Sequence, residues 1–461
     1  MAAVFETSPA RAGWLLRLGD AMRRHGTAIR RLQWLVVAFY GVLIVVPALL
    51  PLPADDAHIL DNLTLFAQFL FWGIWWPFVL LSMVLLGRVW CGVFCPEGTL
   101  TEAVSRHGRG RGMPRWLRWG GWPCVAFVLT TVYGQLVSVY QYAQAALLVL
   151  GGSTLAAMLV GWFYGRGKRV WCRHLCPVNG VFNLLARLAP LHFRVDRERW
   201  DAQAGGITLP PNCAPLIDIR RMHGAAACHA CGRCSGQRDA VALSRRSPNA
   251  EIVEHGGEDA GGWDSALLLF GIIGVAMGAF HWTASPLYVD LRLAAVDWAV
   301  ERGADWLLAD NAPWWLLTHY PQNHDVFTWL DGGLIAAYIL GTGVVVGGLL
   351  YALCALAARL LGALPARHHL ALCFVPLGGV GVFLGLSMTT LSLLKGDGIR
   401  LGGVDEMRAL LLAAAALWTL WLGWRSSGRY AGGVRRLAAS ALLGLGAAGV
   451  VAGWAALFFV W

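Results

Sequence analysis

Two stretches of this sequence place cysteines at a spacing that suits metal–thiolate chemistry. RVWCGVFCPEGTLTEAVSR (88–106) and RVWCRHLCPVNGVFNLLAR (169–187) match at Arg, Val, Trp, both Cys, Pro and the final Arg, 81 residues apart. A cysteine followed by proline is typical of iron–sulfur ligand runs, whereas zinc sites usually use C-x2-C pairs. The repeat therefore favours one 4Fe–4S cluster, with structural zinc as the alternative. Its expected ligands are Cys91, Cys95, Cys172 and Cys176.

A third run, CHACGRC, carries three more cysteines at C-x2-C-x2-C, a spacing that wraps one corner of a 4Fe–4S cluster. The run lacks a fourth cysteine of its own, and the nearest unassigned one is in PPNCAP. We therefore predict a second cluster, although a swap of fourth ligands between the two clusters stays open. The expected ligands are Cys213, Cys228, Cys231 and Cys234. The remaining cysteines, Cys124, Cys354 and Cys373, are interpreted as packing residues in or beside membrane spans.

The elements that carry these motifs are expected to be membrane helices. Of the 461 residues, 57% are hydrophobic and 14% charged, which predicts an all-α polytopic membrane protein. A span needs roughly 20 apolar residues. Nine such runs are found, at 34–53, 64–86, 119–140, 143–164, 265–283, 332–353, 370–392, 409–424 and 437–460.

The charges of the loops predict how these spans are oriented. With a cytoplasmic N-terminus, the cytoplasmic segments hold 32 of the 37 Lys and Arg residues, and the opposite face holds five. This positive-inside asymmetry explains the net charge of +10 without nucleic acid. It predicts a multi-pass membrane protein with every cluster ligand on the cytoplasmic side.

The predicted organisation has four parts. A cytoplasmic amphipathic N-terminus (1–33) is expected to lie on the membrane surface. A four-span repeat unit (34–187) is followed by a cytoplasmic ferredoxin-like cluster segment (188–264). A C-terminal membrane region (265–461) contains a periplasmic loop at 284–331.

The paired CGVFCP and CRHLCP loops and the cysteine run that follows resemble the membrane polyferredoxins of bacterial respiration. These include proteins of nitrate and nitrous oxide respiration and of cytochrome oxidase assembly. The resemblance covers roughly residues 34–245 and implies electron transfer at the bacterial inner membrane. A similar polyferredoxin accompanies some ferrous-iron uptake systems, which would imply a permease subunit and periplasmic metal-binding proteins as partners. The single C-x2-C-x2-C run and the extra C-terminal spans depart from the family pattern.

The periplasmic loop offers a second candidate site. SPLYVDLRLAAVDWAVERGADWLL predicts a helix along the interface, with Leu287, Leu291, Val296 and Trp298 among acidic residues. HYPQNHDVFTWLDGG follows, and its imidazoles and carboxylates could hold iron or copper or meet a partner protein. These residues are His319, His324, Asp325 and Asp331. An ordinary solvated loop is the alternative interpretation.

Two functions remain open on these residues. The first is a membrane electron-transfer protein that passes electrons between two 4Fe–4S clusters and a quinone or a periplasmic redox partner. The second is a transporter or assembly scaffold with structural zinc–cysteine sites. The sequence shows no Gly-rich dinucleotide fingerprint, and no pair of histidines in mid-membrane that would hold a b-type haem. Whether the chain is itself an enzyme is left undecided.

Overall fold

The computed structural model describes residues 13–54, 56–203 and 211–461. Most of this described part is helical, and it contains two small antiparallel sheets. In the described part of the chain, eight helical stretches are long and apolar enough to cross a membrane. They are Gly26–Leu49, Leu63–Leu86, Ala143–Tyr164, Gly262–His281, Trp329–Leu360, Leu364–Gly396, Val404–Ser427 and Gly433–Val460. The all-α polytopic fold predicted from the sequence is therefore confirmed.

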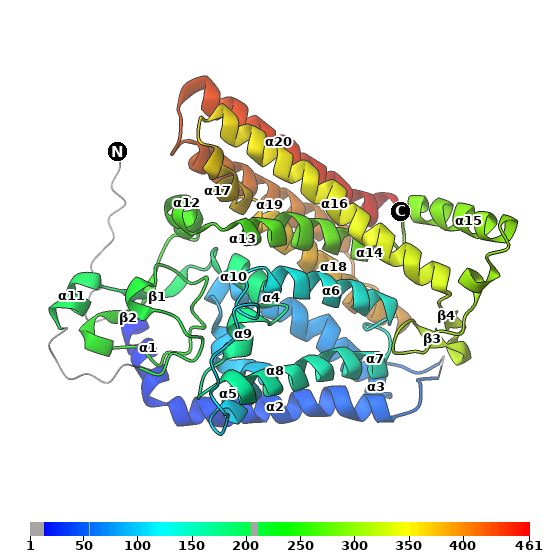
Figure 1. Cartoon of the computed structure of the whole chain (residues 1–461), viewed down its shortest axis with the longest axis horizontal. Helices are drawn as coiled ribbons and strands as arrows, with labels where there is room; N and C mark the ends of the chain where they lie inside the picture. Colours follow the sequence, from blue (N-terminus) through cyan, green and yellow to red (C-terminus); the bar gives the residue numbers. More distant parts are fainter. Residues whose placement is uncertain (1–12, 55, 204–210) are drawn as a thin grey trace. The chain divides into compact units, whose positions relative to one another are not determined.

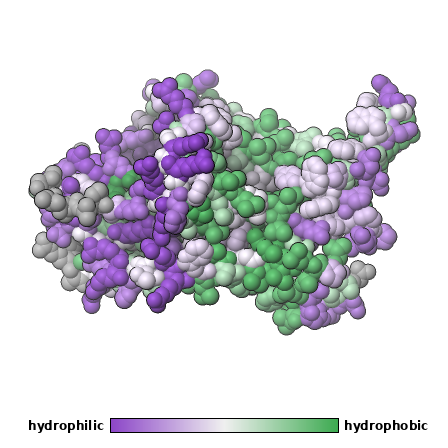
Figure 2. Space-filling view, turned by 60° about the horizontal axis from the view of Figure 1, so that its bottom comes forward, coloured by the Kyte–Doolittle hydropathy of each residue, from purple (hydrophilic) through white to green (hydrophobic). Residues whose placement is uncertain are grey.

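The surface agrees with such spans. Large apolar side chains such as Leu35, Phe78, Leu159 and Val345 are exposed on them, and apolar residues (green) cover wide areas in Figure 2. Exposure of this kind is costly in water and suits contact with lipid.

The remaining expected span, 119–140, corresponds to the shorter helix α6 (Trp122–Leu136), which has 15 residues. At 1.5 Å per residue this helix is about 22 Å long, which is shorter than the hydrocarbon core. It ends because Ser138 adopts a left-handed conformation (φ 50°), and because the Thr318 amide donates to the Leu136 carbonyl at 2.8 Å. The hydroxyl groups of Ser138 and Thr318 also hydrogen-bond at 2.7 Å. A residue 182 positions away thus contributes to this boundary.

The chain divides into two compact units. The first comprises the residues up to Tyr40, Leu81–Arg118 and Ala156–Glu251. It holds α1 (Trp14–Arg24), the first part of α2 (Gly26–Leu49), the end of α4 (Trp76–Leu86), the π-helical turn η2 (Trp90–Phe94), α5 (Pro96–Ser105), most of α8 (Gly152–Tyr164), α9 (Val170–His174), α10 (Asn179–Ala186), β1 (Leu191–Val195), α11 (Arg197–Ala202), the 3-10 turns η4 (Ile219–Arg221) and η5 (Gln237–Asp239), and β2 (Val241–Arg245).

A strand pair forms the core of the extramembrane part of this unit. β1 and β2 are antiparallel, with Phe193 opposite Leu243. Helix α1 packs against β2 (Figure 1), and a Cβ added at the buried Gly19 would lie 3.2 Å from the Leu243 Cβ. One side of α1 covers the strands, because Leu15 and Met22 join their apolar core. The expected position of the N-terminal segment on the membrane surface stays a prediction.

The second unit comprises Gly41–Leu80, Trp119–Leu155 and Ile252–Trp461. Its helices are α3 (Leu63–Gln68), α6, α7 (Ala143–Ala146), α12 (Gly256–Asp259), α13 (Gly262–Ala266), α14 (Ala276–His281), α15 (Pro286–Glu301), α16 (Trp329–Leu360), α17 (Arg367–Leu372), α18 (Val375–Gly396), α19 (Val404–Ser427) and α20 (Gly433–Ala455). The π-helical segments are η1 (Phe69–Trp75), η3 (Leu147–Gly151), η6 (Glu251–His255), η7 (Leu267–Val275) and η11 (Ala456–Val460), and the 3-10 turns are η8 (Asp305–Leu308), η9 (Pro321–Asn323) and η10 (Leu364–Ala366). β3 (His319–Tyr320) pairs with β4 (Asp325–Val326).

Helix α16 is the centre of this unit and packs against η7 and α20 (Figure 1). The helices approach closely at small residues, since a Cβ at Gly274 would lie 2.8 Å from the Gly343 Cα. Such contacts are typical of helix packing in lipid, where the hydrophobic effect does not drive association. A helix was expected after residue 284 and is present as α15, which exposes Leu287 and Leu291, whereas its position at the membrane interface stays a prediction.

Candidate metal centre

The four cysteines of the two C-x3-C-P repeats all lie in the first unit, beside short helices. Cys91 lies in η2, Cys95 caps α5, Cys172 lies in α9, and Cys176 precedes α10. Pro96 occupies the first turn of α5, where its fixed φ suits a helix start. The Gly98 amide donates to the Cys95 Sγ at 3.4 Å, an arrangement that favours a thiolate. In the first repeat, the Cys-Pro pair therefore places Cys95 at the N-terminus of a helix.

The two repeats are joined by polar contacts that cross from one to the other. The Trp171 Nε1 donates to the Glu97 Oε2 at 3.2 Å, and the Arg88 Nη2 donates to the Asn179 Oδ1 at 2.6 Å. These residues flank the cysteines in both repeats. The contacts bring the first C-x3-C-P loop against the second, as a shared centre requires.

The thiols of this set influence one another. Burial raises the pKa of Cys172 to about 12, and Cys91 adds to the increase, whereas Arg169 opposes it. Burial raises the pKa of Cys95 well above its usual value, with further increases from Cys172 and Cys91. Four thiolates at this site thus need a bound cation to offset their mutual repulsion. The donor set fits an iron–sulfur cluster in its chemistry.

The second set is gathered around one small cavity. Its wall includes Cys213, Cys228, Cys231 and Cys234. Burial raises the pKa of Cys228 to about 12, the Ala230 amide lowers it, and Cys231 and Cys213 raise it further. These four thiols come from a stretch of 22 residues and the fold turns them toward a common space. This set also fits a cluster.

All eight cysteines are free thiols. As the side chains stand, no three His, Cys, Asp or Glu residues in the described part of the chain form a group that could hold a metal ion. The mutual effects of the thiols in the first set and the shared cavity of the second nevertheless place each set in one neighbourhood, and the assignment of these cysteines as ligands stays a prediction.

The two sets adjoin one another in the first unit. A Cβ at Gly92, between Cys91 and Cys95, would collide with the His229 carbonyl oxygen and lie 2.9 Å from the Cys231 Cα. Only glycine allows this approach of the CGVFC loop to the CHACGRC loop. Arg88 joins the same two loops, because its Nη1 donates to the Ala226 carbonyl at 2.9 Å and its Nη2 lies 3.1 Å from the His229 Nε2.

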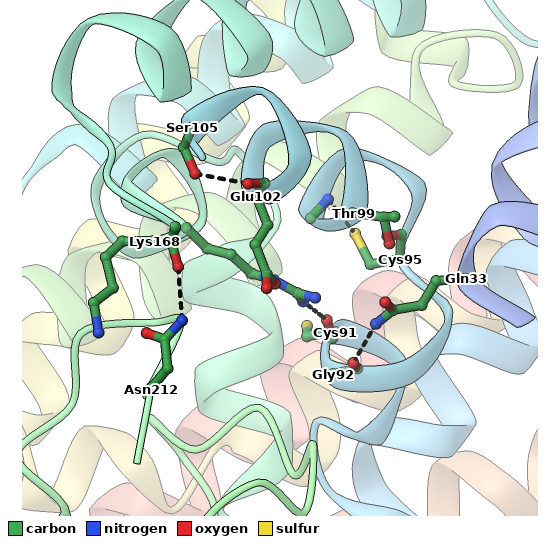
Figure 3. Close-up of polar contacts among 12 residues, drawn as sticks. Gln33, Cys91, Gly92, Cys95, Thr99, Glu102, Ser105, Lys168 and Asn212 are labelled. Atoms are coloured by element: carbon green, nitrogen blue, oxygen red, sulfur yellow. Dashed lines mark hydrogen bonds and ion pairs between the residues drawn. The ribbon is translucent and has the colours of Figure 1, made fainter. Parts of the chain in front are cut away.

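A buried carboxylate lies at this junction. Glu102 extends from α5 toward the loop that carries Cys91 and Gly92 (Figure 3) and is 4% exposed. The Arg169 Nε donates to its Oε2 at 2.9 Å, and Arg233 forms an ion pair with its Oε1 at 2.8 Å. Burial alone would raise the pKa of Glu102, but Arg169 and Arg233 outweigh it and hold the pKa below its usual value. Arg169 Nη1 also donates to the Cys91 carbonyl.

Reasoning from the sequence missed these charged residues. Arg88 and Arg169 are the first residues of the two matching RVWC stretches, and they are 3% and 1% exposed. An arginine kept in both copies beside cysteine ligands is a signal for charge compensation. Glu102 and Arg233 carried no such signal, since their partners are distant in sequence.

The candidate site in the expected periplasmic loop is only partly assembled. His324 and Asp325 line a cavity of about 490 Å³. Asp325 accepts a hydrogen bond from the Tyr142 hydroxyl at 2.8 Å. His319 pairs with Val326 across the sheet, whereas Tyr320 pairs with Asp325. Paired residues of a sheet share a face, so Asp325 faces the same side as Tyr320. Neighbouring residues of a strand face opposite sides, so His319 points to the other side.

Asp331 stabilises the start of α16. It forms a capping box with Thr328, the N-cap residue of this helix, and pairs with the Arg292 Nε at 2.6 Å. A metal at His319, His324 and Asp325 stays a prediction.

The three unassigned cysteines lie where packing was expected, with Cys124 in α6, Cys354 buried in α16 and Cys373 buried between α17 and α18.

The comparisons with known proteins bear on the first set. A family model described as a 4Fe–4S binding domain matches residues 68–114 and 147–196, which contain both C-x3-C-P loops. A candidate electron transport protein of Escherichia coli (strain K12), YccM, is 25% identical over 246 residues, covering 46% of this chain and 67% of the relative. No solved structure matches the chain significantly. The part of this polytopic membrane protein that contains the two C-x3-C-P loops is thus similar to a 4Fe–4S binding domain, which supports an iron–sulfur site there.

Proposed function

We propose that this chain is a membrane-bound iron–sulfur electron-transfer protein that holds two 4Fe–4S clusters on the cytoplasmic side. The observation that carries the proposal is the grouping of eight thiols into two neighbouring sets of four. Cys91, Cys95, Cys172 and Cys176 would hold one cluster, and Cys213, Cys228, Cys231 and Cys234 the other. The electron transport name of the E. coli relative supports the same role.

Adjacent clusters suit electron transfer because tunnelling rates fall steeply with distance. The contact of Gly92 with the His229–Cys231 backbone supports a short path between the two sets. Bound clusters would supply the electron-carrying chemistry, and the chain would supply their thiolates, burial and compensating arginines.

The partners in this proposal follow from the inner-membrane orientation that the loop charges predict. Electrons would be exchanged with a quinone in the bilayer or with a redox protein on the periplasmic side. Ferrous-iron uptake, with a permease and periplasmic metal-binding proteins, is the process that we propose such a polyferredoxin would serve.

Metal and sulfide analysis of anaerobically purified protein tests the proposal. We expect about eight irons and eight labile sulfides per chain, and absorbance that bleaches on reduction. The variant C91S should lose one set of cluster signals and C231S the other. The matched control C124S lies outside both sets and should lose neither.

Two results would contradict this assignment. Stoichiometric zinc without sulfide would favour the scaffold with structural zinc sites. Loss of the same spectroscopic signal in both C91S and C231S would show that the cysteines are partitioned differently.

A further inference from the structure

The carboxylate of Glu102 joins all three cysteine-bearing segments of the first unit. It belongs to α5, directly after the first C-x3-C-P loop. Arg169, which opens the second loop, and Arg233, which lies within CHACGRC, both donate to it. Arg106 adds a longer contact of 3.5 Å from the exposed side. Arg88 of the first loop also reaches the other two segments, through Asn179 and His229, but Glu102 is the carboxylate among these contacts.

We propose that Glu102 and Arg233 are positioning residues that hold the two cysteine sets together and set the reduction potentials of the clusters bound there. This inference rests on the proposed function, because it assumes that both sets are loaded.

The repeat itself supports a dedicated role for Glu102. At the offset of 81 residues, the position equivalent to Glu102 is Asn183. The Asn183 Oδ1 is buried and has no hydrogen-bond partner among the described residues. The two repeats thus share the arginine of RVWC but differ at this position. The carboxylate is present in the repeat whose cysteine loop touches His229 and Cys231.

The charges around Glu102 determine the direction of each effect. A reduced cluster carries one more negative charge than an oxidised one. Replacing Glu102 by Gln leaves Arg169 and Arg233 less compensated, which favours reduction and raises the potentials. Replacing Arg233 by Gln removes a positive charge, which lowers them. Changes of opposite sign would not arise from a general loosening of the fold.

Redox titration of the full-length protein, followed by electron paramagnetic resonance, tests this inference. At a fixed potential near the midpoint, we expect E102Q to raise the ratio of reduced to oxidised cluster about tenfold and R233Q to lower it about tenfold, equal to about 59 mV for one electron. The double variant E102Q/R233Q should fall between the two. The magnetic interaction between the two reduced clusters should weaken in R233Q.

Two further variants separate this role from simple folding. R233K keeps the charge and should restore potentials close to those of the wild type. R106Q removes the partner on the exposed side, whose side chain is 41% exposed, and should leave both potentials unchanged. The Arg233 side chain is 29% exposed, so its replacement by Gln disturbs the interior less than replacement of the buried Glu102. R233Q is therefore expected to retain its iron, and its potentials test the inference even if E102Q loses iron.

The outcomes distinguish this inference from the proposed function. A wild type without two cluster signals overturns the proposed function and this inference with it. Two signals whose potentials stay unchanged in both E102Q and R233Q overturn this inference alone. Loss of both signals in R233Q and equally in R233K assigns Arg233 to folding and also overturns it.

Discussion

The substitution Gly92→Ala tests whether the two cysteine loops depend on each other. Its added methyl group would collide with the His229 carbonyl oxygen and lie 2.9 Å from the Cys231 amide nitrogen and Cα. These are backbone atoms, so no rotation of a side chain can relieve the overlap. Gly92 has no left-handed φ, and alanine is compatible with its local conformation. The clash is therefore the main effect of the change.

The expected cost follows from overpacking a site that has no room. Forcing one methyl group into a filled interior typically costs about 1–3 kcal/mol, and the upper end applies here because backbone must move. The displaced segment, His229–Cys231, lies within the second cysteine set. We therefore expect G92A to lower the midpoint of thermal unfolding and to lose the signal of the second cluster, although the mutated residue lies in the first loop.

The assay compares iron content, cluster spectra and thermal unfolding of G92A with those of G112A. Gly112 has no atom within 4 Å of an added Cβ, and its φ is not left-handed, so G112A should behave like the wild type. A G92A protein with full iron and unchanged stability would refute the close contact of the two loops. Selective loss of the first cluster's signal would refute the reasoning about which loop yields.

Two other predictions concern acid stability and orientation. Burial would raise the pKa of Glu251, but Arg246, Arg187 and the Ala225 amide outweigh it and hold the pKa below its usual value. The ionised carboxylate therefore stabilises the fold above a pH of about 4.3, and this contribution is lost as the pH falls further. In chemical denaturation, the free energy of unfolding of E251Q should therefore fall less with decreasing pH than that of the wild type. An equal fall in both proteins would contradict this prediction. A reporter that is active only in the periplasm should be active when fused after Asn311 and silent when fused after Arg246, and the reverse pattern would overturn the predicted orientation.

The sequence alone was sufficient for features that depend on short stretches of chain. An apolar run of about 20 residues spans the hydrocarbon core whatever its neighbours are, so eight of the nine expected spans correspond to helices of sufficient length. The repeat of RVWC…CP was likewise visible without a fold, and the 4Fe–4S binding domain model matches it. The expected span at 119–140 shows the limit, because Thr318 contributes to ending α6 at Leu136.

Only the tertiary structure determined which of these stretches contact one another and through which residues. Glu102 and Arg233 are 131 residues apart, and no local pattern marks them as partners. Gly92 is one of 56 glycines, and its importance depends on the His229 carbonyl that approaches it. Leu15 and Met22 of α1 pack against the apolar core of the strand pair, a contact that the sequence of α1 does not specify. Long-range contacts of this kind depend on which surfaces the folded chain brings together. The type of side chain at one position does not specify which distant residue will contact it.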